Sequence, residues 1–149
     1  MEPGTLSEEV ELYGRRFTLR SMPRPGLHRV EVQILEGSGA AARPYVRVPV
    51  RGRDQREARD RAIEVLHNYA GLDRYLGLVR QVARTLAPGA HLAVEENALE
   101  IRVELRGSRR LSSPLTLVRE DALDPERTDE ELLTFIRAHL ETHLEDSGP

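Results

Sequence analysis

Two histidines, His139 and His143, stand four residues apart near the end of this 149-residue chain. In a helix this spacing places both imidazole rings on one face, where they can bind the same metal ion. The segment reads His-Leu-Glu-Thr-His, whereas metalloproteases have His-Glu-x-x-His with the catalytic base beside the first ligand. In a regular helix Glu141 points away from the pair by about 160°, so the sequence identifies no third ligand. We therefore expect a structural pair without a metal, and we keep a metal-dependent enzyme or small hydrolase as the weakest hypothesis.

Arginines crowd a second segment, residues 43–61, where a strand pattern gives way to a helix pattern. Three acids, Asp54, Glu57 and Asp60, are interleaved, so the seven arginines leave a local excess of four positive charges. A basic patch beside a helix N-terminus can bind phosphate, which would make it a nucleic-acid site. The alternative is a solvated face with ion pairs, such as Glu57 with Arg61. The candidate binding residues are Arg47, Arg51, Arg53, Arg56 and Arg59.

Residue types with stronger catalytic signals are missing from the sequence. All 22 basic residues are arginine, which excludes a Schiff-base lysine and a phosphate-loop lysine. The lack of cysteine excludes disulfides, thiolate nucleophiles and cysteine-bound zinc. The remaining histidines are scattered, and no Gly-x-Ser-x-Gly elbow accompanies them. We therefore predict no catalytic residue and no cofactor, and the chain is more in keeping with a binding protein than with an enzyme.

The composition is that of an ordinary globular protein, with 39% apolar and 32% charged residues. The net charge of −3 gives no overall attraction to nucleic acid or to an anionic membrane. No apolar run approaches the roughly 20 residues that a membrane span needs, and the first residues lack the pattern of a signal peptide. We expect a cytoplasmic protein with no membrane partner.

The stretch from Arg51 to Leu86 reads as two successive helices. Asp54 and Glu57 form a capping-box pattern at the start of the first, and apolar residues then recur at helical spacing. Gly71 can adopt the left-handed conformation that ends a helix, so we expect the first helix to stop there. The second helix is expected over residues 72–86, ended by Pro88-Gly89.

Alternation of apolar and polar residues predicts the strands, of which 29–34 and 99–105 are the clearest. Shorter strands are expected near residues 10–12, 17–19, 46–50, 92–94 and 115–117. Because proline cannot donate to a ladder, Pro49 places the strand at 45–50 at a sheet edge. A final helix starts near Thr128, where Glu131 completes a capping box, and runs to about Leu144.

These elements predict an α+β fold with antiparallel sheets and helices on one face. We expect a single domain over residues 1–149, which is an ordinary size for one domain. The order strand-strand-strand-helix occurs twice, so the domain can be a tandem βββα pseudo-repeat with halves 8–70 and 90–145. The helix at 72–86 would bridge the two halves.

Two resemblances bear on function. Over about a third of the chain, three expected strands followed by a helix resemble the end of a double-stranded-RNA-binding domain. The residues that carry the resemblance are Gly52-Arg53, Arg56-Glu57-Ala58-Arg59, Ala62 and Leu66. That family has lysines where this helix opens, whereas Gln55 occupies one such position here, and the family begins with a helix, whereas the segment before Phe17 reads as extended. In architecture alone, the acidic α+β chain is similar to the dimeric type III secretion chaperones.

The sequence favours a non-enzymatic protein-interaction module, chaperone-like or regulatory, that acts as a homodimer. The amphipathic final helix and the edge-like strand at 45–50 are the two elements able to add a partner. The alternative is binding of duplex RNA or DNA through the arginines of segment 43–61. Arginines gathered on one exposed face would favour this alternative.

Overall fold

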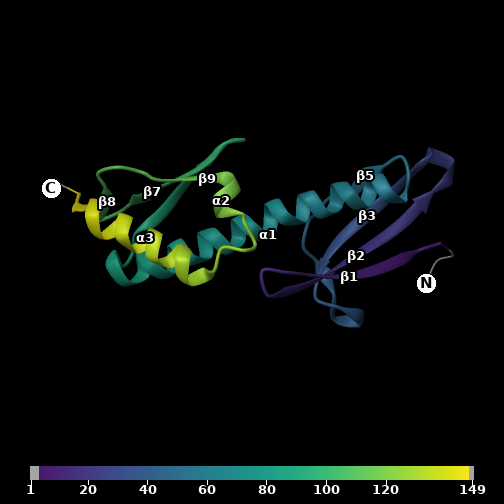
Figure 1. Cartoon of the computed structure of the whole chain (residues 1–149), viewed down its shortest axis with the longest axis horizontal. Coiled ribbons are helices and arrows are strands. Elements are labelled where there is room, and N and C mark those ends of the chain that lie inside the picture. The colour runs from purple at the N-terminus through teal and green to yellow at the C-terminus, as the bar shows by residue number, and fades with distance from the viewer. Residues whose placement is uncertain (1–3, 148–149) are drawn as a thin grey trace. The chain divides into compact units, whose positions relative to one another are not determined.

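The structure, a computed structural model, describes residues 4–147 and has the predicted α+β fold. The chain separates into two compact units, Met1–Ala70 and Gly71–Pro149. Each unit has a hydrophobic core of its own. Helix α1 (Gln55–Leu86) supplies its first half to one core and its second half to the other (Figure 1).

An antiparallel sheet forms most of the first unit. Strands β1 (Leu6–Leu12), β2 (Arg15–Arg24) and β3 (Arg29–Glu36) lie in that order, and two short strands, β4 (Arg43–Pro44) and β5 (Val50–Gly52), each pair with β3. Short 3₁₀ turns, η1 (Pro25–Leu27) and η2 (Gly39–Ala41), occupy the connections. We call this the first sheet.

The first core lies between the first sheet and the first half of α1. Strand alternation turns Phe17, Leu19, Val32 and Ile34 toward the helix and leaves mainly polar residues, such as Arg20 and Gln33, on the other face. The helix contributes mainly small residues to this contact, Ala58, Ala62, Leu66 and Ala70, and all are fully buried. Small side chains let the helix backbone lie close to the sheet, so the contact depends on backbone fit.

Asp54 caps the start of α1 as the sequence predicts. Its carboxylate accepts a hydrogen bond from the Glu57 N–H at 2.8 Å, and Glu57 Oε1 accepts one from the Arg53 N–H at 3.4 Å. The prediction of two helices is wrong, because α1 is a single helix of 32 residues that passes through Gly71. Glycine costs a helix only about 1 kcal/mol relative to alanine. The buried residues on both sides of Gly71 outweigh that cost.

The second unit contains the rest of α1, a three-stranded sheet and a second long helix. Strands β6 (His91–Glu96), β7 (Glu100–Arg106) and β9 (Leu115–Val118) form the second sheet in the order β6-β7-β9. Helix α2 (Arg119–Ala122) leads to α3 (Asp129–His143). Strands β8 (Arg109–Leu111) and β10 (Leu144–Asp146) pair separately with each other.

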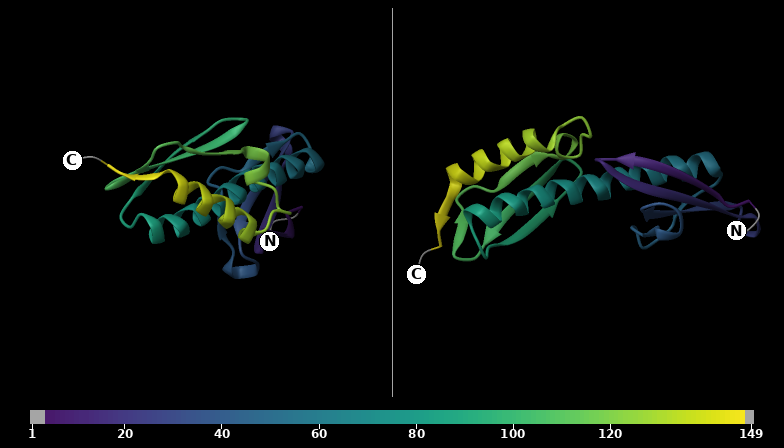
Figure 2. Two further views of the ribbon diagram at one scale, coloured as in Figure 1. Left: turned by 60° about the vertical axis from the view of Figure 1, so that its left-hand side comes forward. Right: turned by 90° about the horizontal axis from the view of Figure 1, so that it is seen from below.

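The second core lies on one face of the second sheet, under α1 and α3 (Figure 2). Alternate residues of β7 are fully or almost fully buried, and α3 buries Leu132, Ile136 and Leu140 against them. Tyr75 of α1 is also fully buried, and its hydroxyl has no hydrogen-bond partner among the described residues. Thr128 caps α3 by accepting the Glu131 N–H at 3.1 Å, as predicted.

Two further predictions differ from the structure. Residues 45–48 bend instead of forming a strand, because the Tyr45 and Val46 N–H groups both donate to the single carbonyl of Ile34, at 2.9 and 3.3 Å. The ladder resumes only at Val50. The tandem pseudo-repeat is not confirmed, since five strands precede α1 and the second unit interposes β8 and α2 before its final helix. Within residues 4–147, no helix has the length and apolar character needed to cross a membrane.

Candidate functional site

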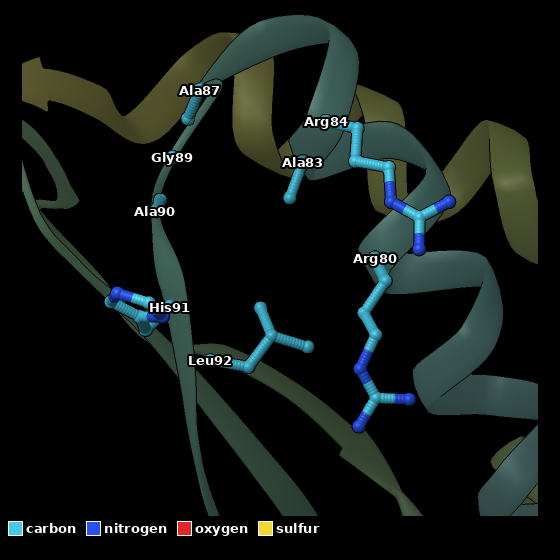
Figure 3. A pocket seen from close by; sticks show the side chains of 8 residues that line it. All are labelled: Arg80, Ala83, Arg84, Ala87, Gly89, Ala90, His91 and Leu92. Atoms are coloured by element: carbon cyan, nitrogen blue, oxygen red, sulfur yellow. The ribbon is translucent and has the colours of Figure 1, made fainter.

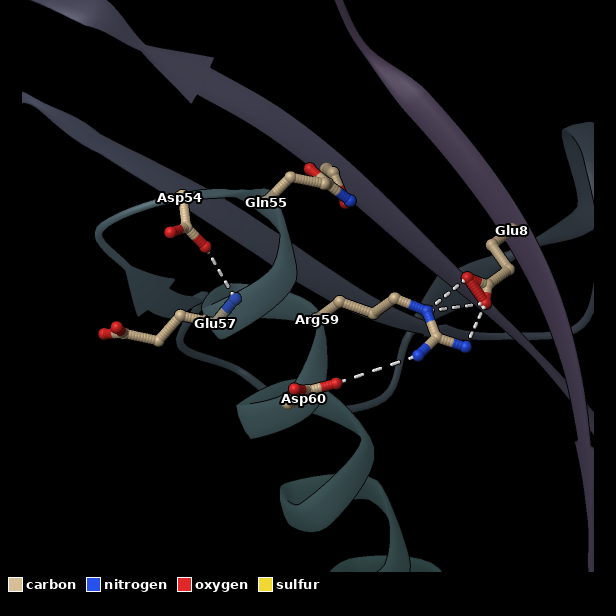
Figure 4. Close-up of polar contacts among 7 residues, drawn as sticks. Glu8, Asp54, Gln55, Glu57, Arg59 and Asp60 are labelled. Atoms are coloured by element: carbon tan, nitrogen blue, oxygen red, sulfur yellow. Dashed lines mark hydrogen bonds and ion pairs between the residues drawn. The ribbon is translucent and has the colours of Figure 1, made fainter.

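The arginines at the start of α1 are engaged in ion pairs with neighbouring carboxylates. Arg59 forms a two-pronged contact with Glu8 of β1, at 2.7 Å from Nε to Oε1 and 2.8 Å from Nη2 to Oε2, and also lies 3.9 Å from Asp60 (Figure 4). Arg53 Nε donates to Glu57 Oε2 at 2.9 Å. These contacts reduce the charge that the two arginines can offer to a ligand.

The ion pairs also shift acid–base behaviour. The hydrogen bond from Arg59 lowers the pKa of Glu8 below its usual 4.5, and the hydrogen bond from Arg53 lowers the pKa of Glu57 in the same way. A lowered folded-state pKa means that the stability from each pair is present above 4.5 and is lost as the pH falls through the folded value. The pairs are solvent-exposed, so their contribution is small.

The five candidate arginines do not gather on one face. Arg51 belongs to β5 and lies opposite Glu31 in the strand register, with its Nε 4.0 Å from the Glu31 carboxylate on the sheet face away from α1. Arg53, Arg56 and Arg59 lie on or just before α1, on the other side of the first sheet. Arg47 and Arg56 are exposed and have no ion-pair partner in the part of the chain that the structure describes. Of the five candidates, therefore, two carry a charge without an ion-pair partner in the described chain.

A hollow on the outer face of the first sheet contains arginine that the sequence analysis did not single out. Arg20 of β2 and Arg47 line it together with Gln33 and apolar residues of the loop after β3, around about 330 Å³. Nearby, Glu31 contacts Arg29 at 2.9 Å and Arg24 at 3.9 Å. Arginine recurs at every fourth position, at Arg16, Arg20 and Arg24, and this spacing on one face of a strand is the signal in the sequence that points to this face.

His139 and His143 lie side by side as their spacing predicts, with ring centroids 4.4 Å apart. His139 Nε2 is 2.9 Å from the Ser113 carbonyl oxygen, and His143 Nδ1 is 3.2 Å from the Ser112 hydroxyl. Because a carbonyl only accepts, His139 Nε2 carries the hydrogen and cannot also bind a metal. Residues 4–147 contain no group of three or more metal-ligating side chains. The geometry fits a pair that holds the end of α3 against the loop before β9, and the absence of a metal stays a prediction.

Strand β6 forms one edge of the second sheet, and a hollow of about 330 Å³ lies between it and the end of α1. Ala83, Ala87 and Leu92 form the apolar part of the lining, and Figure 3 shows Leu92 pointing from the strand toward α1. Arg80 and Arg84, one helical turn apart, extend from α1 at the rim. Both are exposed and have no ion-pair partner among the described residues.

The side chains of β6 divide between the two faces of the second sheet. Leu92 and Val94 lie opposite Leu105 and Val103 of β7 and so face the core, but Leu92 is half-buried and Val94 is 37% exposed. The acidic residues Glu95 and Glu96 end the strand, and His91 begins it. In the described chain, the strand thus combines an edge that faces no neighbouring strand, incompletely covered apolar side chains, a histidine at its start and an acidic end.

Comparison with known proteins identifies no relative: no family model, curated protein or solved structure matches this chain. The two resemblances seen in the sequence therefore stay predictions. The first element among the described residues is strand β1, where a double-stranded-RNA-binding domain has a helix.

Proposed function

We propose that the protein is a non-enzymatic protein-interaction module, chaperone-like or regulatory, that acts as a homodimer in the cytoplasm. The edge strand β6 carries this proposal. Its outer backbone groups lie beside incompletely covered Leu92 and Val94 and beside the unpaired Arg80 and Arg84 in the described chain. An extended segment that adds to such an edge gains ladder hydrogen bonds, apolar contact and charge pairing together.

Two elements that the sequence analysis offered for partner binding are less suited to it. The apolar stripe of α3 is already fully buried in the second core. Residues 45–48 bend and do not present a strand edge. We assign partner binding to strand β6 instead of these two elements. Its six residues form a sheet edge that is a longer template for an added strand than the three residues of β5.

Binding of duplex RNA or DNA through the arginine segment is the alternative function. The ion pairs of Arg53 and Arg59, and the position of Arg51 on the opposite sheet face, speak against it. Phosphate binding releases counterions in proportion to the charges that reach the backbone, and few of these arginines are available to do so.

The oligomeric state is the first test of the proposal. We expect light scattering to give the mass of a dimer, twice the 16.9 kDa of one chain, at micromolar concentration. Apolar surface left uncovered along β6 is the physical reason. A monomer mass that persists across dilution up to high concentration would contradict the homodimer.

Nucleic-acid binding gives the second test. We expect no complex with a duplex of about 20 base pairs near physiological salt, because the roughly three unpaired arginines of segment 43–61 neutralise too few phosphates. Fluorescence anisotropy of labelled duplex RNA and DNA checks this. The comparison variant replaces Arg53, Arg56 and Arg59 together by glutamine. A micromolar or tighter complex, with a salt dependence that becomes shallower in this variant, would place the alternative first.

A further inference from the structure

We propose that β6 of one copy pairs antiparallel with β6 of a second copy, with Ala93 opposite Ala93 at the two-fold axis. The inference rests on the proposed homodimer and specifies its interface. It joins two three-stranded sheets into one sheet of six strands.

Charge distribution selects β6 over the other long edge strand, β1. Strand β1 has seven residues and carries Glu8, Glu9 and Glu11 along its length, so antiparallel self-pairing centred on it would bring carboxylates opposite one another. In β6 both acids lie at one end, Glu95 and Glu96. Antiparallel pairing moves those acids away from each other and toward the start of the partner strand, beside which Arg80 and Arg84 of the partner's α1 lie. The edge of β1 repels a copy of itself, whereas the edge of β6 attracts one.

The register follows from the faces of the strand. Directly opposite residues in an antiparallel pair lie on the same face, so Ala93 opposite Ala93 puts Leu92 opposite the partner's Val94. Both belong to the core face in their own sheet, since they lie opposite Leu105 and Val103 of β7. The pairing therefore covers the exposed part of Val94, which is 37% exposed in the single chain. A shift by one residue would set Leu92 opposite Glu95 and lose this apolar contact.

The same register gives the acidic residues at the end of each strand a polar or basic neighbour from the other copy. On the outer face, His91 lies opposite the partner's Glu95. On the core face, the partner's Glu96 arrives beside Ala90, in the hollow whose rim carries Arg80 and Arg84. Glu96 already forms an ion pair with Arg119 at 2.9 Å, so it would share its two oxygens between Arg119 and the incoming guanidinium groups. The partner copy thus supplies the acid that the basic hollow lacks.

Cysteine substitution tests the register directly, because the chain has no cysteine of its own. Opposite residues in an antiparallel pair have Cα atoms about 4.5–5.5 Å apart, which is within disulfide range. We expect Ala93→Cys to form a disulfide-linked dimer under mild oxidation, with at least about tenfold more cross-linked product than Val94→Cys, whose copies would stand diagonally at about 7–8 Å. Thr116→Cys, on the outer face of β9, is the control for collisional cross-linking.

A charge at Val94 tests the interface without cross-linking. We expect Val94→Arg to give a monomer mass at a concentration where the unaltered chain is a dimer, because the new charge would lie opposite Leu92 of the partner. Leu99→Arg is the matched control, since Leu99 is 77% exposed in the turn after β6, and it should remain a dimer. Circular dichroism checks that both variants keep their secondary structure.

Each other outcome overturns a defined part of the inference. Stronger cross-linking at position 94 than at position 93 would overturn the register. A dimer that persists in Val94→Arg and does not cross-link at position 93 would overturn the β6 interface and leave the homodimer standing. A monomeric unaltered chain would overturn the homodimer and this interface together.

Discussion

Gly52→Ala is expected to lower the free energy of unfolding by about 3 kcal/mol, the upper end of the usual cost of overpacking. A Cβ atom at Gly52 would lie 2.3 Å from the Ala58 nitrogen and 2.6 Å from its Cα. Both are backbone atoms of α1, so no side-chain rotation can relieve the collision. The helix would have to move away from β5 and lose contacts along its buried alanines. Urea unfolding followed by circular dichroism measures the change.

Gly77→Ala is the matched control for this prediction. Gly77 also belongs to α1, but a Cβ there would meet no atom within 4 Å. Alanine is favoured over glycine in a helix, so we expect a gain of about 0.5–1 kcal/mol. A Gly52→Ala protein as stable as the unaltered chain would mean that α1 does not lie against β5 in the way described.

Arg74→Met is expected to cost about 1–2 kcal/mol, because it leaves two part-buried carbonyl groups without their donor. The Arg74 side chain is only 11% exposed and donates to the Asp124 carbonyl at 3.3 Å, to the Arg127 carbonyl and to the Asp129 carboxylate at 2.8 Å. One guanidinium thus holds the loop before α3 against α1. Thermal and urea unfolding both report the loss.

Asp129→Asn distinguishes the two parts of this contact. Asp129 is 66% exposed, so its ion pair with Arg74 should be worth less than about 1 kcal/mol. If the ion pair rather than the carbonyl contacts dominates, Asp129→Asn will cost as much as Arg74→Met. High salt would then weaken the unaltered protein to a similar degree.

Local patterns predicted the elements whose structure is decided locally. Asp54 and Thr128 cap the starts of α1 and α3, as their sequence patterns predict. The alternation in residues 99–105 corresponds to strand β7. The helix end predicted at Gly71 is wrong, because the helical conformation there depends on packing in two cores. No local sequence pattern contains that information. Val46 and Val48 alternate as a strand does, but the backbone around Tyr45 bends toward the Ile34 carbonyl.

The candidate site required information that the sequence could not supply. The residues of β6 were predicted as a short strand, but its place at a sheet edge follows from the order β6-β7-β9. Arg80 and Arg84 come from a helix that precedes the strand, and only the fold brings them to the same hollow as Leu92. The sequence identifies the arginines of segment 43–61 but not their ion-pair partners. Glu8, which pairs with Arg59, lies 51 residues from it in the chain.

The burial of Tyr75 gives the second unit an optical reporter. The chain has four tyrosines and no tryptophan, so its near-ultraviolet absorbance and fluorescence come mainly from tyrosine. Burial raises the pKa of the Tyr75 phenol well above its usual 10.0. Because the folded state holds this proton more tightly, the associated stability is complete below pH 10 and is lost as the pH rises toward the folded value. In an alkaline titration, the Tyr75 phenolate signal should therefore appear together with the loss of α1 and α3 helicity, so this part of the tyrosinate absorbance records the opening of the second core.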